Sequence, residues 1–261
     1  MIFCFSGTGN SLWAAEELAR LTADEVCMMA DTDEASLRKT FLEAKAVGFV
    51  FPVYGWTLPA VVRDFIKRLP TADNGEQPYV YALLTCGDDI GRTDRVLAES
   101  LTGKGWKLSA SFSVSMRETY ICLPGFDTDT PERETGKREA AKEKIAARIA
   151  PCVNSRKAST PADVHPGSFP WFKTYVIGPL FHRFLTSPRK FRADSSLCTG
   201  CTRCSKICPL GNISAEKGAA PLWGTHCTFC MACYHACPRH AVTHGPFTRS
   251  KGQVHIERNR I

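Results

Sequence analysis

Two cysteine runs near the C-terminal end constrain the fold of this chain more than any other feature. Eight of its 13 cysteines lie between residues 198 and 237, in two copies of the pattern C-x2-C-x2-C-x3-C-P. The first copy contains Cys198, Cys201, Cys204 and Cys208, and the second contains Cys227, Cys230, Cys233 and Cys237. Cysteines separated by two other residues on a loop can reach three corners of one metal–sulfur cube. The x3 step begins a short helix that directs the fourth sulfur away.

This spacing matches the bacterial ferredoxin signature, in which thiolates hold 4Fe–4S clusters and the fourth cysteine of each run ligates the other cluster. We therefore predict two 4Fe–4S clusters with exchanged ligands. The predicted ligands of the first cluster are Cys198, Cys201, Cys204 and Cys237. The predicted ligands of the second cluster are Cys227, Cys230, Cys233 and Cys208.

Two other uses of these cysteines compete with the cluster interpretation. A disulfide framework is disfavoured because a large cysteine-poor region precedes the runs. We also expect no secretory signal, since Met1 leads directly into a short apolar stretch. Zinc would need only C-x2-C pairs and does not explain three evenly spaced cysteines followed by x3-C-P, twice. The other cysteines lack ligand spacing and are predicted to be small buried hydrophobes: Cys4, Cys27, Cys86, Cys122 and Cys152.

The first residues predict a phosphate site. The apolar run 2–5 is expected as a strand, and the apolar periodicity from Leu12 onward predicts a helix. Loop N–H groups and a helix N-terminus converge on an anion, glycines allow close approach, and hydroxyls add hydrogen bonds. The P-loop lysine and the G-x-G-x-x-G pattern are both missing, so a flavin phosphate is favoured over other nucleotides and over a simple tight turn. The loop itself is Ser6-Gly7-Thr8-Gly9-Asn10-Ser11.

Strands and helices alternate through the first 150 residues. Further strands are expected over 25–30, 46–53, 78–85 and 106–116, and further helices over 33–44, 60–69, 93–101 and 132–150. The last strand alternates apolar residues with serines, which predicts an edge strand with one wetter face. Five strands alternating with helices predict the α/β class, a doubly wound parallel sheet with its ligand site at the carboxyl ends of the strands.

Three loops at that edge carry a resemblance to a known family. The phosphate loop and the loops after the third and fourth strands resemble the three FMN-binding loops of flavodoxins. The stretches F-P-V-Y-G-W-T-L-P, L-L-T-C-G-D-D and F-S-V-S-M-R-E-T-Y-I resemble the bacterial ferredoxin family whose N-terminal region resembles flavodoxins. The likeness covers nearly the whole chain. It implies a flavodoxin-like five-stranded domain followed by a small α+β bacterial-type ferredoxin domain.

The resemblance also implies which residues contact FMN. The phosphate would lie against Ser6, Gly7, Thr8, Gly9, Asn10 and Ser11. One side of the flavin ring would lie along Pro52, Tyr54, Gly55 and Trp56. The other side would lie along Thr85, Cys86, Gly87, Asp88 and Asp89. Either aromatic offers a face for the ring, and packing in the core is the alternative for both.

The third of these loops departs from the family pattern. Where the family tends to carry G-G-S after T-C, this chain has Gly87-Asp88-Asp89, which puts the side-chain roles in this loop in doubt. A carboxylate near the flavin would disfavour the anionic reduced form and lower the potential of that couple. The alternative is that both carboxylates are solvated loop charges.

The composition divides the chain into four parts. We expect an FMN-binding domain over 1–152, a linker over 153–190, a two-cluster ferredoxin domain over 191–247 and a polar tail over 248–261. The linker contains an aromatic, helical segment over 169–185 that we expect to pack between the domains. This segment is too short and too charged to span a bilayer, and an interfacial membrane helix is the alternative.

The net charge limits the partners. The formal charge of +7 would suit a nucleic-acid-binding protein. Two oxidised clusters and a flavin phosphate, at about −2 each, would bring the loaded protein close to neutral, so we expect no nucleic-acid partner. We also expect no membrane association. Oxygen-sensitive clusters and unpaired cysteines favour a reducing cytoplasm.

These features favour an electron-transfer protein that relays electrons between FMN, two clusters and redox partner proteins, with no catalytic side chain. The alternative is a reductase that acts on a small molecule at the FMN and uses the clusters as its electron inlet. Its pocket would be lined by Tyr54, Trp56, Asp88 and Tyr120. A third hypothesis is a structural iron–sulfur module with an empty flavodoxin fold. Without a second nucleotide-binding fold, direct oxidation of NAD(P)H is not expected.

Overall fold

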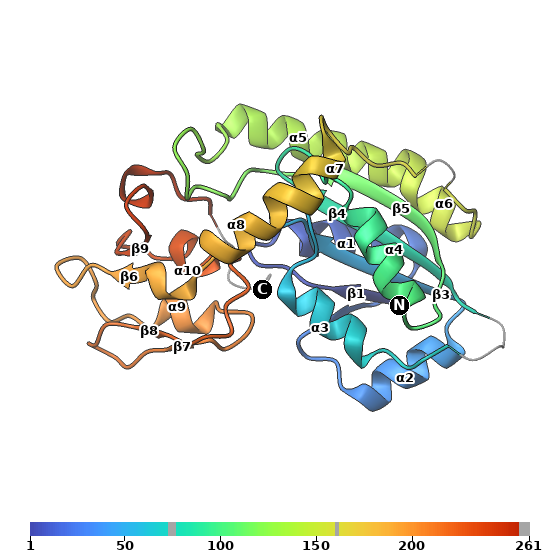
Figure 1. Ribbon diagram of the computed structural model, residues 1–261, viewed down its shortest axis with the longest axis horizontal. Helices are drawn as coiled ribbons and strands as arrows, with labels where there is room; N and C mark the ends of the chain where they lie inside the picture. The colour runs from blue at the N-terminus through green and yellow to red at the C-terminus, as the bar shows by residue number, and fades with distance from the viewer. Residues whose placement is uncertain (73–76, 160–161, 256–261) are drawn as a thin grey trace.

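A five-stranded sheet forms the centre of the N-terminal part of the chain (Figure 1). The computed structural model describes residues 1–72, 77–159 and 162–255. All five strands are parallel and lie in the order β2-β1-β3-β4-β5. This is the flavodoxin-like order of a doubly wound sheet, so the predicted fold class is confirmed. The strands are β1 (Ile2–Cys4), β2 (Val26–Met28), β3 (Ala46–Pro52), β4 (Tyr79–Cys86) and β5 (Leu108–Ser115).

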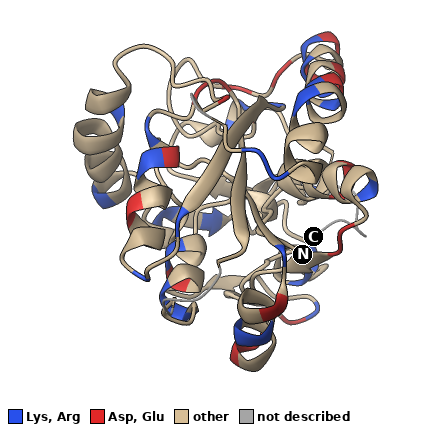
Figure 2. Ribbon diagram, turned by 90° about the vertical axis from the view of Figure 1, so that its right-hand side faces the viewer, with Lys and Arg blue, Asp and Glu red and all other residues tan. Residues whose placement is uncertain are grey.

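Helices cover both faces of this sheet. One face carries α1 (Asn10–Thr22) and a continuous helical stretch made of α5 (Pro131–Lys144), η1 (Ile145–Ile149) and α6 (Ala150–Asn154). The other face carries α2 (Glu34–Glu43), α3 (Ala60–Arg68) and α4 (Thr93–Thr102). Successive strand residues, such as Phe49 and Val50, feed the two opposite cores. Figure 2 shows that the charged residues lie mainly on the outer helices.

Local signals set the helix boundaries close to their predicted positions. The Asp33 side chain accepts the Ser36 N–H at the start of α2. Thr130 caps α5 in the same way, and Pro131 follows at the first helical position. The helix predicted over 132–150 extends to Asn154, because η1 continues it without a break.

The edge strand β5 differs from its prediction. It lies at the edge of the sheet as expected, but the prediction of a wetter face is wrong, since Ser111 and Ser113 are only 6% and 3% exposed. The chain after α6 runs along this strand. The Ser113 N–H donates to the Asp163 carbonyl and the Asp163 N–H donates to the Ser111 carbonyl, at 3.1 and 3.0 Å. Part of the predicted linker therefore covers the sheet edge, while its residues 160–161 lie outside the described residues.

The C-terminal part is a small domain of two strand pairs and two short helices. The pairs are β6 (Phe191–Ala193) with β9 (Val242–His244) and β7 (Ile213–Ser214) with β8 (Leu222–Trp223), both antiparallel. The helices are α9 (Arg203–Lys206) and α10 (Ala232–His235), one in each cysteine run. This arrangement confirms the predicted ferredoxin-type α+β domain.

The segment expected as a polar tail packs on this small domain as far as residue 255. The Tyr234 hydroxyl oxygen lies 2.9 and 2.8 Å from the carbonyl oxygens of Thr248 and Lys251. Thr248 and Val254 are buried. The last six residues of the expected tail, 256–261, lie outside the described residues.

One helical stretch connects the two parts, and in Figure 1 it runs diagonally from the sheet to the small domain. Its buried Thr174 contacts two loops at the carboxyl edge of the sheet. The Thr174 hydroxyl donates to the Trp56 carbonyl at 3.0 Å and accepts the Arg92 N–H at 2.8 Å. Among the described helices, none has both the length and the apolar character of a bilayer-spanning segment. The connecting stretch consists of α7 (Pro170–Phe172), η2 (Lys173–Ile177) and α8 (Gly178–Phe184).

Replacing Thr174 with valine tests how firmly this stretch is held. Thr174→Val keeps the side-chain shape but leaves the Trp56 carbonyl and the Arg92 N–H without their partner. We expect the free energy of unfolding to fall by about 1–3 kcal/mol, measured by urea titration at equal iron content. The control is Thr102→Val, whose hydroxyl bonds only to the carbonyl of Ala98 in its own helix. That change should stay within about 0.5 kcal/mol, and equal losses in both variants would contradict the prediction.

Candidate functional site

A pocket of about 530 Å³ opens at the carboxyl ends of β1, β3 and β4, and both domains contribute to its walls. Its volume is within the range of about 300–1,000 Å³ that is typical of small-molecule sites. Of the residues predicted to contact FMN, only Gly9 is absent from the lining. The structure brings together Ser6, Gly7, Thr8, Asn10, Ser11, Pro52, Tyr54, Gly55, Trp56, Thr85, Cys86, Gly87, Asp88 and Asp89.

The loop after β1 shapes the phosphate end of the pocket. Gly9 precedes α1 with φ of 94°, a left-handed conformation that favours glycine, and the Ser6 hydroxyl accepts its N–H at 3.1 Å. The first N–H groups of α1 have no partner within the helix. Beside them, the hydroxyl oxygens of Ser11 and Thr85 lie 2.7 Å apart. Such a helix start, surrounded by hydroxyls, suits an anion such as a phosphate.

A basic residue that the sequence did not single out lies at the same end. Arg117 lines the pocket, donates to the Thr8 carbonyl at 3.1 Å and pairs with Glu134 at 2.9 Å. Its Nε is buried without a hydrogen-bond partner among the described residues. The only signal was its place in the stretch F-S-V-S-M-R-E-T-Y-I, where the resemblance gave it no role. Arg117 places a positive charge next to the candidate phosphate site.

The two aromatic candidates lie on the pocket wall, and both are half-buried. Tyr54 packs edge-on against Phe5 with ring centroids 6.4 Å apart, at the margin of one core. Burial raises the pKa of the Tyr54 hydroxyl well above its usual value, so it stays neutral. Trp56 lies outside the main cores, and its ring centroid is 5.5 Å from the Lys173 ammonium. Trp56 is therefore less constrained by core packing than Tyr54.

The two aspartates of the third loop have different environments. Asp89 is buried, pairs with Lys173 and accepts the Gly91 N–H at 3.1 Å, so its charge is compensated. Asp88 is exposed, and it makes no ion pair with a described residue. The hypothesis that a carboxylate lowers the flavin potential therefore applies to Asp88. Burial, with Asp89 and Asp88 nearby, raises the pKa of Cys86 to about 12, which argues against a reactive thiol.

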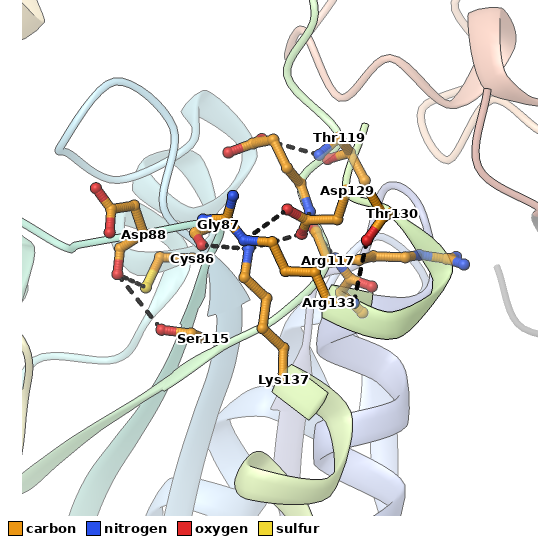
Figure 3. A network of polar contacts seen from close by, with 12 residues as sticks. Cys86, Gly87, Asp88, Ser115, Arg117, Thr119, Asp129, Thr130, Arg133 and Lys137 are labelled. Carbon is orange, nitrogen blue, oxygen red and sulfur yellow. Dashed lines mark hydrogen bonds and ion pairs between the residues drawn. The ribbon is translucent and has the colours of Figure 1, made fainter. Parts of the chain in front are cut away.

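A polar network fixes the wall behind this loop (Figure 3). The Lys137 ammonium donates to the Gly87 carbonyl at 2.8 Å and pairs with Asp129 at 2.6 Å. Asp129 also pairs with Arg133 at 3.2 Å and accepts the Glu118 N–H at 2.8 Å. The network thus ties the loop after β4 to the segment between β5 and α5.

That segment supplies two further polar groups to the pocket. Burial raises the pKa of Glu118, although its carboxylate accepts the N–H groups of Tyr120 and Thr119 at 2.7 and 2.8 Å. The Tyr120 hydroxyl is buried without a partner among the described residues. A buried polar atom of this kind is satisfied when a ligand supplies the missing hydrogen bond.

The eight cysteines form two groups, each with three sulfurs from one run and one from the other. The four predicted ligands of the first cluster line one small cavity: Cys198, Cys201, Cys204 and Cys237. In the second group, burial and the neighbouring Cys208 thiol raise the pKa of Cys227. All 13 cysteines are unpaired. Among the described residues no three His, Cys, Asp or Glu side chains converge on a single ion, whereas a 4Fe–4S cube takes one thiolate at each of four iron corners.

The second group of cysteines is the one that faces the pocket, a point that the sequence left open. Cys230 lines the pocket together with Phe229 and Met231. A Cβ atom added to Gly7 would collide with the Cβ of Cys230 and would lie 2.8 Å from the Tyr54 hydroxyl. Gly7 is therefore required because the second cysteine run lies directly on the phosphate loop.

Comparison with known proteins identifies the second domain. Residues 197–242 match the family model of the 4Fe-4S dicluster domain. Together with the strand order of the sheet, this match defines the two-part architecture of the chain. The chain is a flavodoxin-like domain fused to a ferredoxin-type 4Fe–4S domain. The fusion therefore combines a doubly wound sheet with an iron–sulfur module, which indicates redox activity.

Among curated proteins, none matches the fusion. Solved structures that resemble its first domain include the Trp repressor binding protein from Bacillus subtilis, with 14% identity, a TM-score of 0.39, and 56% of this chain and 96% of that chain covered. A flavodoxin of Streptococcus pneumoniae TIGR4 shows 18% identity, a TM-score of 0.35 and coverage of 56% and 96%. Rubredoxin oxygen:oxidoreductase from Desulfovibrio gigas shows 19% identity, a TM-score of 0.42 and coverage of 59% and 36%. The fold assignment of the fusion rests on its strand order.

The two halves of the ferredoxin-type domain differ in the hydrogen-bond donors around their cysteines. In each half a backbone N–H donates to the fourth cysteine, from Asn212 to Cys208 at 3.3 Å and from Ala241 to Cys237 at 3.2 Å. Only the second half has a tryptophan, Trp223, four residues before its first cysteine, where the first half has an aspartate.

The indole N–H of Trp223 is directed at the second group. Its nitrogen is buried without a standard hydrogen bond among the described residues. Burial and the neighbouring Cys230 thiol raise the pKa of Cys233, whereas the Trp223 N–H lowers it. Trp223 is held in place by stacking on Phe191, with ring centroids 5.6 Å apart. The group that faces the pocket thus has the buried Trp223 indole beside its sulfurs, and the Phe229 N–H donates to Cys227 at 3.4 Å.

Replacing Trp223 tests this donor. Hydrogen bonds to cluster sulfurs stabilise the more negative reduced state, so Trp223→Phe should shift one iron–sulfur couple of the fusion to a more negative potential. The measurement is a redox titration followed by electron paramagnetic resonance. Trp171→Phe is the control, because Trp171 is exposed on the connecting helix. Unchanged potentials in Trp223→Phe would show that the indole N–H does not stabilise a reduced cluster.

Proposed function

We propose that this protein is an electron-transfer protein that holds FMN in the pocket between its domains and two 4Fe–4S clusters in its ferredoxin-type domain. A bound flavin exchanges two electrons and a cluster exchanges one, so the three groups together connect a two-electron couple with a one-electron couple. The observation that carries this proposal is the contact of Cys230 with Gly7, which puts a cluster ligand and the phosphate loop in one pocket.

The residues of the pocket support FMN. The helix start at Asn10 and the charge of Arg117 would hold the phosphate. The loops after β3 and β4 would hold the ring, with Trp56 available for stacking. The pocket volume of about 530 Å³ suits a single ligand of this size.

Aromatic side chains line the pocket on the side of the ferredoxin-type domain. Tyr120 packs on Phe181 and Phe229 with ring centroids 5.4 and 6.3 Å apart. These three side chains come from the segment after β5, the connecting helix and the second cysteine run. Their contact joins the two domains beside the pocket. No side chain need act as an acid, base or nucleophile for this function.

The proposal includes redox partner proteins in a reducing cytoplasm, where thirteen unpaired cysteines are stable. One observation favours the reductase as a second candidate. Glu118 combines a raised pKa with a position on the pocket wall, and the Tyr120 hydroxyl lies in the same wall. Both groups could supply protons to a small molecule reduced at the flavin.

Anaerobic purification followed by cofactor counting tests the proposed function. We expect one flavin and about eight irons per chain, as two 4Fe–4S clusters require. Stopped-flow absorbance should then show that reduction of the iron–sulfur chromophore is followed by reduction of the flavin. Full iron without flavin, or a flavin that stays oxidised after the clusters are reduced, would contradict the proposal. Steady turnover of a small acceptor would favour the reductase.

The charge of Asp88 provides a second test. Removing a carboxylate beside the flavin favours its anionic reduced form, so Asp88→Asn should raise the flavin midpoint potential. The measurement is spectroelectrochemistry at low ionic strength. The control is Asp31→Asn, since Asp31 is an exposed residue that does not line the pocket. Equal potentials in the wild type and Asp88→Asn would mean that Asp88 is a solvated loop charge.

A further inference from the structure

The first group of cysteines lies where the ferredoxin-type domain meets solvent. Cys201 is the exposed member among the eight cysteines of the two runs. None of the first group lines the pocket between the domains, whereas Cys230 of the second group does. The two groups therefore have different neighbours: the second faces the pocket, and the first reaches the surface at Cys201.

The positive charge of the protein is concentrated in the same domain. Residues 188–255 contain nine Lys and Arg but only two Asp and Glu, Asp194 and Glu216. Residues 1–187 are balanced, with 22 basic and 23 acidic side chains. Two clusters at about −2 each would leave the ferredoxin-type domain positively charged. The net positive charge of the side chains in residues 188–255 therefore exceeds the negative charge of the two clusters.

Basic side chains lie next to the exposed ligand. Arg203 and Arg239 line the same cavity as Cys201. Lys217 lies on the neighbouring turn, in which the Gly218 N–H donates to the Gly200 carbonyl at 3.1 Å. None of these three basic side chains forms an ion pair with a described residue. Of the two acids, Asp194 pairs with Arg249, and Glu216 shares the turn of Lys217.

We propose that an acidic one-electron carrier protein docks on this face, formed by Cys201, Arg203, Lys217 and Arg239. It would exchange electrons with the cluster held by the first cysteine group. This inference rests on the proposed function and adds the site at which electrons enter the protein. One electron crosses in each encounter: the iron–sulfur centre of the carrier is oxidised by one electron, this cluster is reduced by one electron, and no bond or proton is transferred.

The exposed ligand favours a redox protein over other acidic partners. Basic surfaces also attract nucleic acids, but those gain nothing from a cluster ligand at the surface. An electron carrier gains from the exposed ligand, because its redox centre can come close to this cluster without entering the protein. Opposite charges on the two partners would raise the rate of encounter and fix their orientation.

The experiment uses the fully loaded protein and a reduced, acidic 2Fe–2S ferredoxin as the probe, because the absorbance spectrum of a 2Fe–2S centre differs from that of a 4Fe–4S cluster. Stopped-flow absorbance measures how fast the iron–sulfur chromophore of the protein is reduced. We expect the bimolecular rate constant to fall about tenfold or more between about 20 mM and 0.5 M salt, because ions screen the attraction. A rate constant that does not depend on salt would overturn the proposal.

Charge reversal then locates the docking face. At low salt, Lys217→Glu and Arg239→Glu should each slow the reduction about three- to tenfold, and the difference from the wild type should vanish at high salt. Lys142→Glu is the matched control, because Lys142 is exposed on α5 of the other domain. Arg239 is close to the ligand Cys237, so iron counts must confirm that each variant is fully loaded. Lys217 lies farther from any ligand in the sequence. Slowing by Lys142→Glu as large as that by Lys217→Glu would overturn the assigned face.

Two absorbance signals separate this inference from the proposed function. The iron–sulfur signal reports docking, and the flavin signal that follows reports transfer between the domains. Cluster reduction that depends on salt and on Lys217, with no flavin reduction, would support the docking face and contradict the relay. Flavin reduction that follows a cluster step insensitive to Lys217 and Arg239 would support the relay and overturn the docking face.

Discussion

The close approach of the second cysteine run to the phosphate loop is the contact on which the rest of this structure depends. Glycine is required at position 7 because the Cβ of Cys230 and the Tyr54 hydroxyl occupy the space of a side chain. The connecting helix helps to hold the two domains together through contacts with the loops of the pocket. His182 lies 3.0 Å from the Tyr54 carbonyl, and Lys173 pairs with Asp89. One helix therefore holds both loops of the pocket and the domain that closes it.

The two cysteine runs have the same spacing but lie in different environments. The two cysteine runs share their spacing, their short helices and the backbone N–H that donates to the fourth sulfur. They differ in what surrounds them, since one run packs on the pocket and the other carries an exposed ligand. Trp223 and Asp194, which occupy equivalent positions before the two runs, make the halves chemically distinct. Packing against different surroundings and a few sequence differences together give the two cysteine runs different properties.

The sequence predicted those features that depend on local spacing. The strand and helix alternation, the grouping of the cysteines and the loops of the pocket all follow from patterns within short windows. Features that depend on contacts across long stretches of chain could not be predicted. Asp89 is compensated by Lys173, 84 residues away, and Ser113 is covered by Asp163. Arg117 and the unpartnered Tyr120 hydroxyl can be recognised as pocket residues only in the structure, because neither has a distinctive local sequence pattern.

The shared wall of the pocket also couples the two domains thermodynamically. Phe229 and Cys230 belong to the iron–sulfur module, yet they bound the space in which the other ligand lies. Any ligand that orders this wall stabilises the folded state of both domains, and such coupling between two sites is necessarily reciprocal. Loss of iron should therefore weaken the binding of a ligand in the pocket. Removal of that ligand should in turn make iron easier to lose from the second group of cysteines. Under the proposed function, loading of the cofactors would be cooperative, because each bound cofactor would stabilise the site of the other.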